Sequence, residues 1–168
     1  QVIVDDDDQT NGIGDAATGD DVPANETGTL SHDYGADGAG TTLLTGVVGL
    51  TSTLATTEGA FYYGLDGTST TLTIYQIQGG VSVGVVEVAL SNTTDGSYTV
   101  TQLAAVDHAA GSDENNQDFT INYEVTDGDG DTAPGTLDVR VDDDLPTTGL
   151  NDQVIVDDDD QTNGIGDA

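Results

Sequence analysis

Apolar residues recur at every second position in several short stretches of the chain. The alternation is found at 71–76, 86–90, 97–103, 118–125 and 136–141. In the fourth stretch, for example, Phe119, Ile121, Tyr123 and Val125 are separated by single, mostly polar residues. Because successive side chains of a strand point to opposite faces, each stretch is predicted to be a strand with one buried face.

Turn-forming residues separate these stretches, as in the segment TTDGS at 93–97. No window carries the sustained i, i+3, i+4, i+7 apolar pattern of a capped helix, so helices are predicted to be short or absent. Several short strands joined by Gly, Asp and Asn turns are typical of an all-β protein. We predict an antiparallel, immunoglobulin-like β-sandwich whose two sheets supply the core and whose loops carry the carboxylates.

The first sixteen residues, QVIVDDDDQTNGIGDA, recur without change at 153–168. The repeat distance is 152 residues (153 − 1), which predicts a tandem array and identical modules as the neighbours of this one in the same chain. The division expected is an acidic linker and first-strand region at 1–28, the sandwich at 29–146, and a linker with the start of the next repeat at 147–168. The apolar run at 2–4 is either an edge strand or an extended link. A monomer is expected.

The charge balance is extreme, with 32 acidic residues against the single basic residue Arg140 and a formal net charge of −31. Nucleic acid is excluded as a partner because its binding depends on Lys and Arg. An anionic membrane surface would repel the chain, and no stretch approaches the roughly 20 apolar residues of a membrane span. Self-repulsion of this size requires an offset, which bound cations can supply.

The sequence gives little support for disulfide bonds or for other kinds of metal site. Without Cys, disulfides and thiolate sites are impossible. The two histidines, His32 and His108, are too few and too scattered for a zinc site, and His108 is expected to form a loop hydrogen bond. No signal peptide is visible; for a segment internal to an array, targeting signals are expected elsewhere. No catalytic motif is found, so the module is expected not to be an enzyme.

The densest group of carboxylates lies in the segment TDGDGD at 126–131, where Asp127, Asp129 and Asp131 alternate with Gly. Counted from Asp127, the spacing meets the D-x-D-x-D calcium template, with Asp138 at position 12. However, Thr132 replaces the Gly of position 6 and predicted strands flank the loop, which excludes an EF-hand. We predict a calcium site in a hairpin loop; the alternative interpretation is an acidic turn that is only solvated.

A second set of acidic residues lies at the joints between repeats. Neighbouring residues of an extended chain point to opposite sides, so only about two carboxylates of each run can face one ion. Flanking apolar residues favour ordered calcium sites, whereas an acidic run alone would be a self-repelling linker. The candidate ligands of the joints are Asp5, Asp6, Asp7, Asp142, Asp143, Asp144, Asp157 and Asp158. Weaker candidates are Asp33, Asp37, Asp66, Asp113, Glu114 and Asp118.

Several segments together resemble the tandem repeats of giant type I secreted adhesins of the repeats-in-toxin (RTX) class. They are YGADGAG at 34–40, YYGLDGT at 62–68, DGSYTVTQLAAVDH at 95–108 and TDGDGDTAPGTLDVRVDDDLP at 126–146. The resemblance implies an extracellular, bacterial cell-surface extender of biofilm formation, stiffened by calcium at the joints (residues 142–144) and in the loop at 127–131. The Gly-rich nonapeptide repeats of the class are missing, and residues 1–16 have no counterpart in its pattern.

Two functions from different classes are therefore compared. The first is a structural extender in which several Ca²⁺ ions order the acidic runs and hold successive modules in line. The alternative is a calcium-dependent adhesion module that recognises a sugar, ice or a protein surface through Tyr34, Tyr62, Tyr63 or Tyr75, while Tyr98 and Tyr123 are expected in the core. A third possibility is that the acidity only maintains solubility in high salt.

Overall fold

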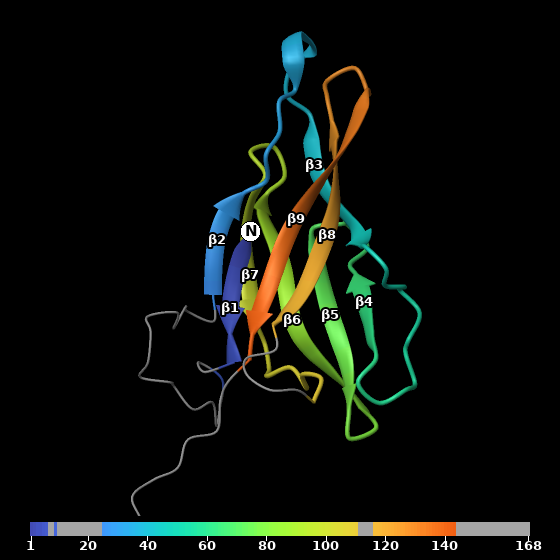
Figure 1. Cartoon of the computed structure of the whole chain (residues 1–168). Helices are drawn as coiled ribbons and strands as arrows, with labels where there is room; N and C mark the ends of the chain where they lie inside the picture. The colour runs from blue at the N-terminus through green and yellow to red at the C-terminus, as the bar shows by residue number, and fades with distance from the viewer. Residues whose placement is uncertain (7–8, 10–24, 111–115, 144–168) are drawn as a thin grey trace, which may run out of the picture.

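The computed structural model describes residues 1–6, 9, 25–110 and 116–143. These residues form two β-sheets packed face to face (Figure 1). One sheet has the order β1-β9-β8-β3, and the other β2-β7-β6-β5-β4. The strands are β1 (Val2–Asp5), β2 (Asn25–Thr29), β3 (Thr41–Val47), β4 (Phe61–Leu65), β5 (Thr71–Gln78), β6 (Val81–Asn92), β7 (Ser97–Gln102), β8 (Gln117–Thr126) and β9 (Thr132–Asp142). The predicted all-β, immunoglobulin-like sandwich is confirmed.

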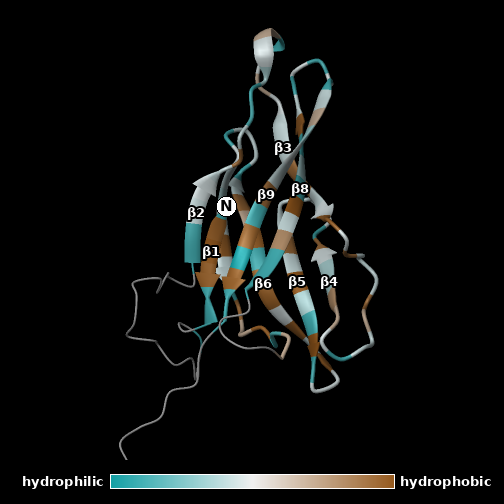
Figure 2. Cartoon of the chain, viewed as in Figure 1, coloured by the Kyte–Doolittle hydropathy of each residue, from teal (hydrophilic) through white to brown (hydrophobic). Residues whose placement is uncertain are grey.

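The alternating stretches of the sequence lie within strands, except that Leu103 follows the end of β7 and is 46% exposed. In β8 the four predicted core residues are at most 8% exposed, and in β9 Val139 and Val141 are fully buried. Figure 2 shows the same alternation as brown and teal bands along the strands. Helical structure in the described residues consists of 3-10 turns, at Asp6 and in η2 (Gly35–Asp37). Nothing in the described part of the chain forms a helix with the length and hydrophobicity of a membrane span.

The interior is filled by aliphatic side chains from both sheets together with two tyrosines. Tyr98 and Tyr123 are 7% and 5% exposed, as predicted, and burial raises the pKa of both phenols. The Tyr123 hydroxyl donates a hydrogen bond to the Ser31 carbonyl oxygen over 2.7 Å. Buried phenols need such a partner, because an unsatisfied polar group in the core is costly.

The parallel pairing of β1 with β9 is the exception to an otherwise antiparallel arrangement. Val2 lies opposite Val139 and Asp5 opposite Asp142. Val4 is fully buried, so the first apolar run is an edge strand of the sandwich. Strands β1 and β2 both come from the region 1–29, which therefore contributes to both sheets.

This parallel pairing gives the module two different ends. We call the end where β1 and β9 finish the base; it also holds the loop 103–110 that follows β7 (Figure 1). We call the opposite end the tip; it holds η2 and the turn between β8 and β9 (Figure 1). Each end carries one group of side chains that could hold a metal ion.

Candidate metal centres

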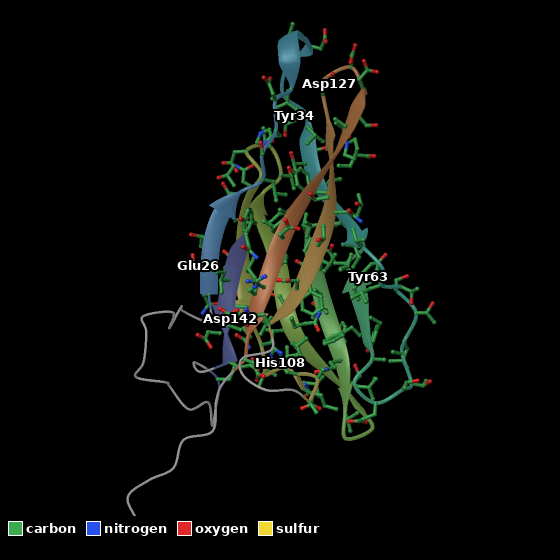
Figure 3. All side chains as sticks on the ribbon, in the orientation of Figure 1. Glu26, Tyr34, Tyr63, His108, Asp127 and Asp142 are labelled. Atoms are coloured by element: carbon green, nitrogen blue, oxygen red, sulfur yellow. The ribbon has the colours of Figure 1, made fainter. Side chains whose placement is uncertain are left out.

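The group at the base combines residues from three separate segments. Asp6 follows β1, His108 lies in the loop 103–110, and Asp143 follows β9. One ligand atom from each residue can be chosen so that all three atoms lie within 4.8 Å of one another. Figure 3 shows His108 and Asp142 at this end of the molecule. Three donors at this separation can contact one cation.

The parallel pairing of β1 and β9 explains why acidic residues so distant in sequence meet. In a parallel pair both strands end at the same edge of the sheet, so the acidic runs that follow them are neighbours. Asp5 and Asp142 occupy opposed positions in the register, and Asp5 and Asp6 are only 5% and 3% exposed. The predicted joint ligands Asp5, Asp6, Asp142 and Asp143 are thus brought to one place.

Two glutamines of β5 hold the loop that carries His108. The fully buried Gln76 accepts the Asp107 N–H at 2.8 Å and donates Nε2 to the Asp107 carbonyl oxygen, also at 2.8 Å. Gln78 donates Nε2 to the Ala105 carbonyl oxygen at 2.9 Å. The backbone on the N-terminal side of His108 is therefore tied to the sheet, which orients the imidazole toward the end of β1.

Asp6 is the centre of the base group. Its carboxylate accepts the Val106 N–H at 3.1 Å and a hydrogen bond from Gln102 Nε2, and its Oδ2 lies 3.2 Å from His108 Nε2. The Asp6 and His108 side chains are 4% and 5% exposed. Gln102 is 4% exposed, and its Oε1 is buried with no hydrogen-bond partner. A buried polar atom of this kind is uncommon, and a bound ion or water can satisfy it.

The single basic side chain does not serve the base group, because it is engaged on the outer face of the sheet. Arg140 donates Nε and Nη2 to the two carboxylate oxygens of Asp118 at 2.8 and 3.1 Å. This contact lowers the pKa of Asp118 and raises that of Arg140. Asp118, a weak candidate ligand, is therefore half of an ion pair.

The group at the tip consists of Asp37, Asp127 and Asp129, whose ligand atoms also lie within 4.8 Å of one another. Asp127 is labelled at the tip in Figure 3. Its Oδ1 accepts the N–H groups of residues 129, 130 and 131 at 3.3, 3.0 and 2.9 Å. A side-chain hydrogen bond with Asp129 is the main cause of the lowered pKa of Asp127, and the three N–H groups act in the same direction. Neighbouring carboxylates of this kind can be stabilised by a shared proton or by a cation.

Close backbone contact joins the two loops of the tip. The Gly128 N–H donates to the Gly38 carbonyl oxygen at 3.1 Å. A Cβ atom on Gly128 would lie only 2.3 Å from the Asp37 carbonyl oxygen. Glycine is required here because any side chain would push the η2 loop away from the turn.

The remaining predicted ligands are distributed as follows. Asp33 and Asp131 line a cavity of about 110 Å³ beside Asp127, but they are not members of the group of three. Asp33 Oδ1 accepts the Gly35 N–H at 2.8 Å. Strands β8 and β9 flank the loop, and Asp138 accepts a hydrogen bond from the Thr120 hydroxyl at 2.9 Å, so position 12 of the calcium template is occupied by a strand residue.

Other candidates have structural explanations or lie outside the described residues. Asp66 closes its turn by accepting the N–H groups of Thr70 and Thr71 at 2.8 and 3.1 Å. Hydrogen bonds, first that of the Thr68 hydroxyl, lower the pKa of Asp66. Outside the described residues lie Asp7, Asp144, Asp157, Asp158, Asp113 and Glu114.

Sequence reasoning missed His108 and Gln102 as members of the base group. His108 was expected to form a loop hydrogen bond, yet it lies beside Asp6 and within ligand distance of Asp143. Neither the preceding Asp107 nor the position of His108 after β7 indicates in the sequence that His108 contacts Asp6. The alternation in β7 does place Gln102 on the buried face, and a buried glutamine at a strand end was the signal available.

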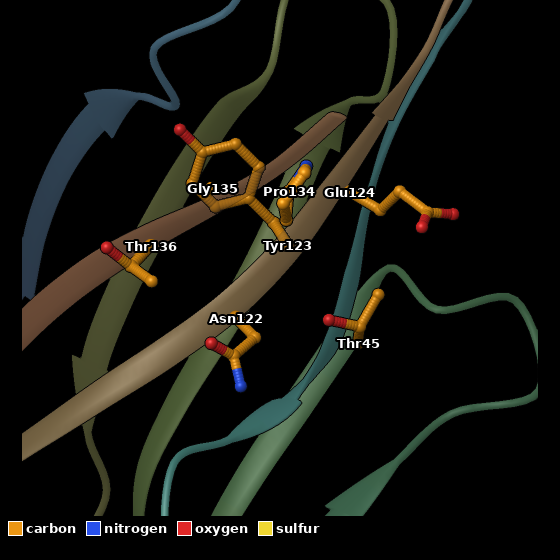
Figure 4. Close-up of a pocket in the computed structure, with 7 residues that line it drawn as sticks. All are labelled: Thr45, Asn122, Tyr123, Glu124, Pro134, Gly135 and Thr136. Atoms are coloured by element: carbon orange, nitrogen blue, oxygen red, sulfur yellow. The ribbon is translucent and has the colours of Figure 1, made fainter. Parts of the chain in front are cut away.

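A depression on the face of one sheet is of a different kind. It has a volume of about 460 Å³ and lies over β8 and β9 (Figure 4). Its lining consists of Thr45, Asn122, Tyr123, Glu124, Pro134, Gly135 and Thr136. Glu124 is its only carboxylate, and the Tyr123 hydroxyl is already bonded to Ser31. The arrangement offers no group of ligands for a cation.

Fold and sites together define an acidic, all-β sandwich module with a candidate cation site at each end. Residues 1–140 match a family described as a domain of unknown function (DUF5801), and the chain belongs to that family. No curated protein and no solved structure matches the chain.

Proposed function

We propose that the chain is a structural extender module of a long, repetitive bacterial cell-surface adhesin. In this proposal Ca²⁺ ions bound at the ends of each sandwich hold successive modules in line and project a distal binding domain from the cell. The observation that carries the proposal is the parallel pairing of β1 with β9, which gathers acidic residues where the chain leaves the module. The resemblance to RTX-class adhesin repeats supports the extracellular location.

The position of the repeat in the fold supports a role in spacing. Strand β9 ends at the base with Asp142, and the next copy of the β1 sequence starts at residue 154, so eleven residues (143–153) connect them. A short connection limits how far successive modules can separate. Metal ions bound to the acidic residues at the start of this connection would restrict its conformations further.

Electrostatics supports the need for cations in such an array. Each repeat carries many more acidic than basic residues, and the one arginine is already paired. Successive modules repel one another, and the repulsion is strongest where acidic ends meet. Ca²⁺ binds carboxylate and carbonyl oxygens with flexible geometry, and extracellular calcium modules have dissociation constants of about 10⁻⁴ to 10⁻³ M. The proposed module acts without catalysis.

The alternative is a calcium-dependent module that binds a sugar, ice or protein surface. Tyr62 and Tyr75, one candidate pair, occupy opposed positions on β4 and β5 and stack with ring centroids 5.0 Å apart. Cross-strand aromatic pairs of this kind stabilise sheets, so the two rings already have a structural role. Specific glycan binding by one module, lost in Tyr62→Ala, would favour this alternative.

The test is the length of a two-repeat chain measured by small-angle X-ray scattering. A strand of twelve residues such as β6 spans about 40 Å, so two modules in line should reach at least about 80 Å. We expect a single extended shape in millimolar Ca²⁺ and a broad, more compact distribution after chelation.

Variants separate calcium binding from simple charge removal. Asp143→Asn, in the base group, should shorten the chain in calcium, whereas Glu124→Gln, which removes one exposed charge outside both groups, should not. An identical distribution of lengths with calcium and with chelator would refute the extender proposal.

A further inference from the structure

The two candidate sites offer different donor atoms. The tip group consists of three carboxylates, and its members are exposed or half-buried. The base group contains an imidazole nitrogen, and its central carboxylate is buried. Calcium takes six to eight oxygen ligands, whereas imidazole suits zinc and other divalent transition metals. The donor sets therefore predict different metals at the two ends.

We propose that the base site binds Zn²⁺ in preference to Ca²⁺, through Asp6, His108 and Asp143 with the Gln102 amide as a further ligand or partner. The inference rests on the proposed function only in that both assign a cation to this end of the module; Ca²⁺ occupies the base when zinc is absent, and Zn²⁺ replaces it there when present. It also revises the expectation from sequence that two scattered histidines exclude zinc, because zinc also binds Asp and Glu oxygens and two carboxylates can complete a donor set that contains one histidine.

Burial favours a bound metal over a solvated ion pair. The Asp6 carboxylate and the His108 imidazole are at least 95% removed from solvent, with their nearest atoms 3.2 Å apart. A buried charge is costly unless it is paired or coordinates a metal. Zinc sites typically contain three or four protein ligands, and the described side chains of this group supply three, one of them an imidazole.

Gln102 provides an observation independent of the acidic residues. Its amide lies against Asp6, with which Nε2 forms a hydrogen bond, while Oε1 is buried with no hydrogen-bond partner. Rotation of the amide by 180° exchanges the two atoms without moving the rest of the side chain. Oε1 would then face the carboxylate, an arrangement that is favourable when a cation lies between the two oxygens.

Neighbouring residues hold His108 in place, and a depression beside it gives a cation access to the site. Gln76 fixes the backbone beside His108 through two hydrogen bonds, as metal sites need their ligands held in place. His108 also lines a depression of about 360 Å³, together with Glu58 and Asp107. A cation can approach the imidazole from this side, and the two acidic residues attract it.

The experiment uses the full 168-residue chain without a histidine tag, stripped of metal by a chelator. Titration calorimetry with Zn²⁺ and, separately, with Ca²⁺ measures affinity, and the visible absorption of bound Co²⁺ reports the geometry at the base. We expect zinc to bind with one equivalent at the base and to resist displacement by millimolar calcium.

Two histidine variants form a matched pair. His108→Gln should weaken zinc binding by at least about tenfold, the lower limit for loss of a supporting residue, and should change the Co²⁺ spectrum. His32→Gln should change neither, because His32 lies outside the base group, where its Nδ1 is 2.7 Å from the Leu30 carbonyl oxygen. If His108→Gln fails to fold, Asp143→Asn provides the same comparison.

Unchanged zinc affinity in His108→Gln would overturn the inference, as would displacement of zinc by an equal concentration of calcium. The two proposals fail separately. If zinc does not bind at the base but calcium still extends the two-repeat chain, the zinc inference is wrong and the extender proposal stands. If zinc binds through His108 but no cation changes the length of the chain, the inference stands and the extender proposal is wrong.

Discussion

The docking of β1 onto the sandwich is the feature on which the base site depends, and Val4→Ala tests it. Val4 is fully buried and lies opposite Val141, and β1 also contacts β7 and β2 of the other sheet. The substitution removes two buried methyl groups, at about 0.8 kcal/mol each. A cavity term adds to this, for a total loss of about 2 to 3 kcal/mol. That is a large part of the 5 to 15 kcal/mol typical of a domain.

Urea and thermal unfolding followed by tyrosine fluorescence and far-UV circular dichroism measure the effect. For a chain of this size we expect Tm to fall by about 4 to 12 °C. Because β1 carries Asp5 and Asp6 to the base, metal affinity at the base should fall while that of the tip is unchanged. Val48→Ala is the control, since Val48 is 58% exposed and should change stability by no more than about 0.5 kcal/mol. Equal effects of the two substitutions would refute the docking of β1.

Three further predictions concern the tip and the surface. Ca²⁺ at ten times its dissociation constant should raise Tm by about 3 to 6 °C for one occupied tip site. Asp129→Asn should remove this shift. An equal shift in NaCl of the same ionic strength would contradict specific calcium binding. Gly128→Ala should weaken calcium binding at the tip, because its Cβ would meet a backbone oxygen at 2.3 Å, whereas Gly67→Ala has no atom within 4 Å and should have no effect in the same titration. Arg140 lowers the pKa of Asp118 below its unfolded value, so the pair stabilises the fold above the unfolded pKa of about 3.9 and this contribution is lost as pH falls through the lower folded pKa. Asp118→Asn should therefore cause a small loss of stability at pH 7, small because Asp118 is 60% exposed, and none in strong acid; an equal loss at both pH values would argue against the ion pair.

Much of the fold could be predicted from local patterns. Alternation identified β5, the centre of β6, and β7, β8 and β9, and it placed Phe119 and Ile121 in the core. The stretch FYYGL of β4 was not predicted to be a strand, because its residues show no alternation, and in the structure every one of them is half-buried. β4 lies at the edge of its sheet and pairs there with β5 alone. Burial depends on the position of a strand in the sheet, which the local sequence does not show.

The candidate sites were predictable only in part. Asp127 and Asp129 lie in one short loop, so their proximity follows from the spacing of the sequence and the turn that Gly permits. Asp37 belongs to another loop, and its meeting with them depends on the contact between Gly128 and Gly38. No local rule connects these segments, because the pairing of β3 with β8 brings them together.

By itself the sequence determined the all-β character, the positions of most strands, the large negative charge and the loops in which carboxylates are concentrated. These properties depend on the two-residue period of a strand and on composition, both of which are local. Only the tertiary structure decided that β1 runs parallel to β9 and that Asp6, His108 and Asp143 meet at one end. Strand pairing joins residues far apart in the chain, and its direction depends on which buried faces fit together, so it is a property of the whole sandwich.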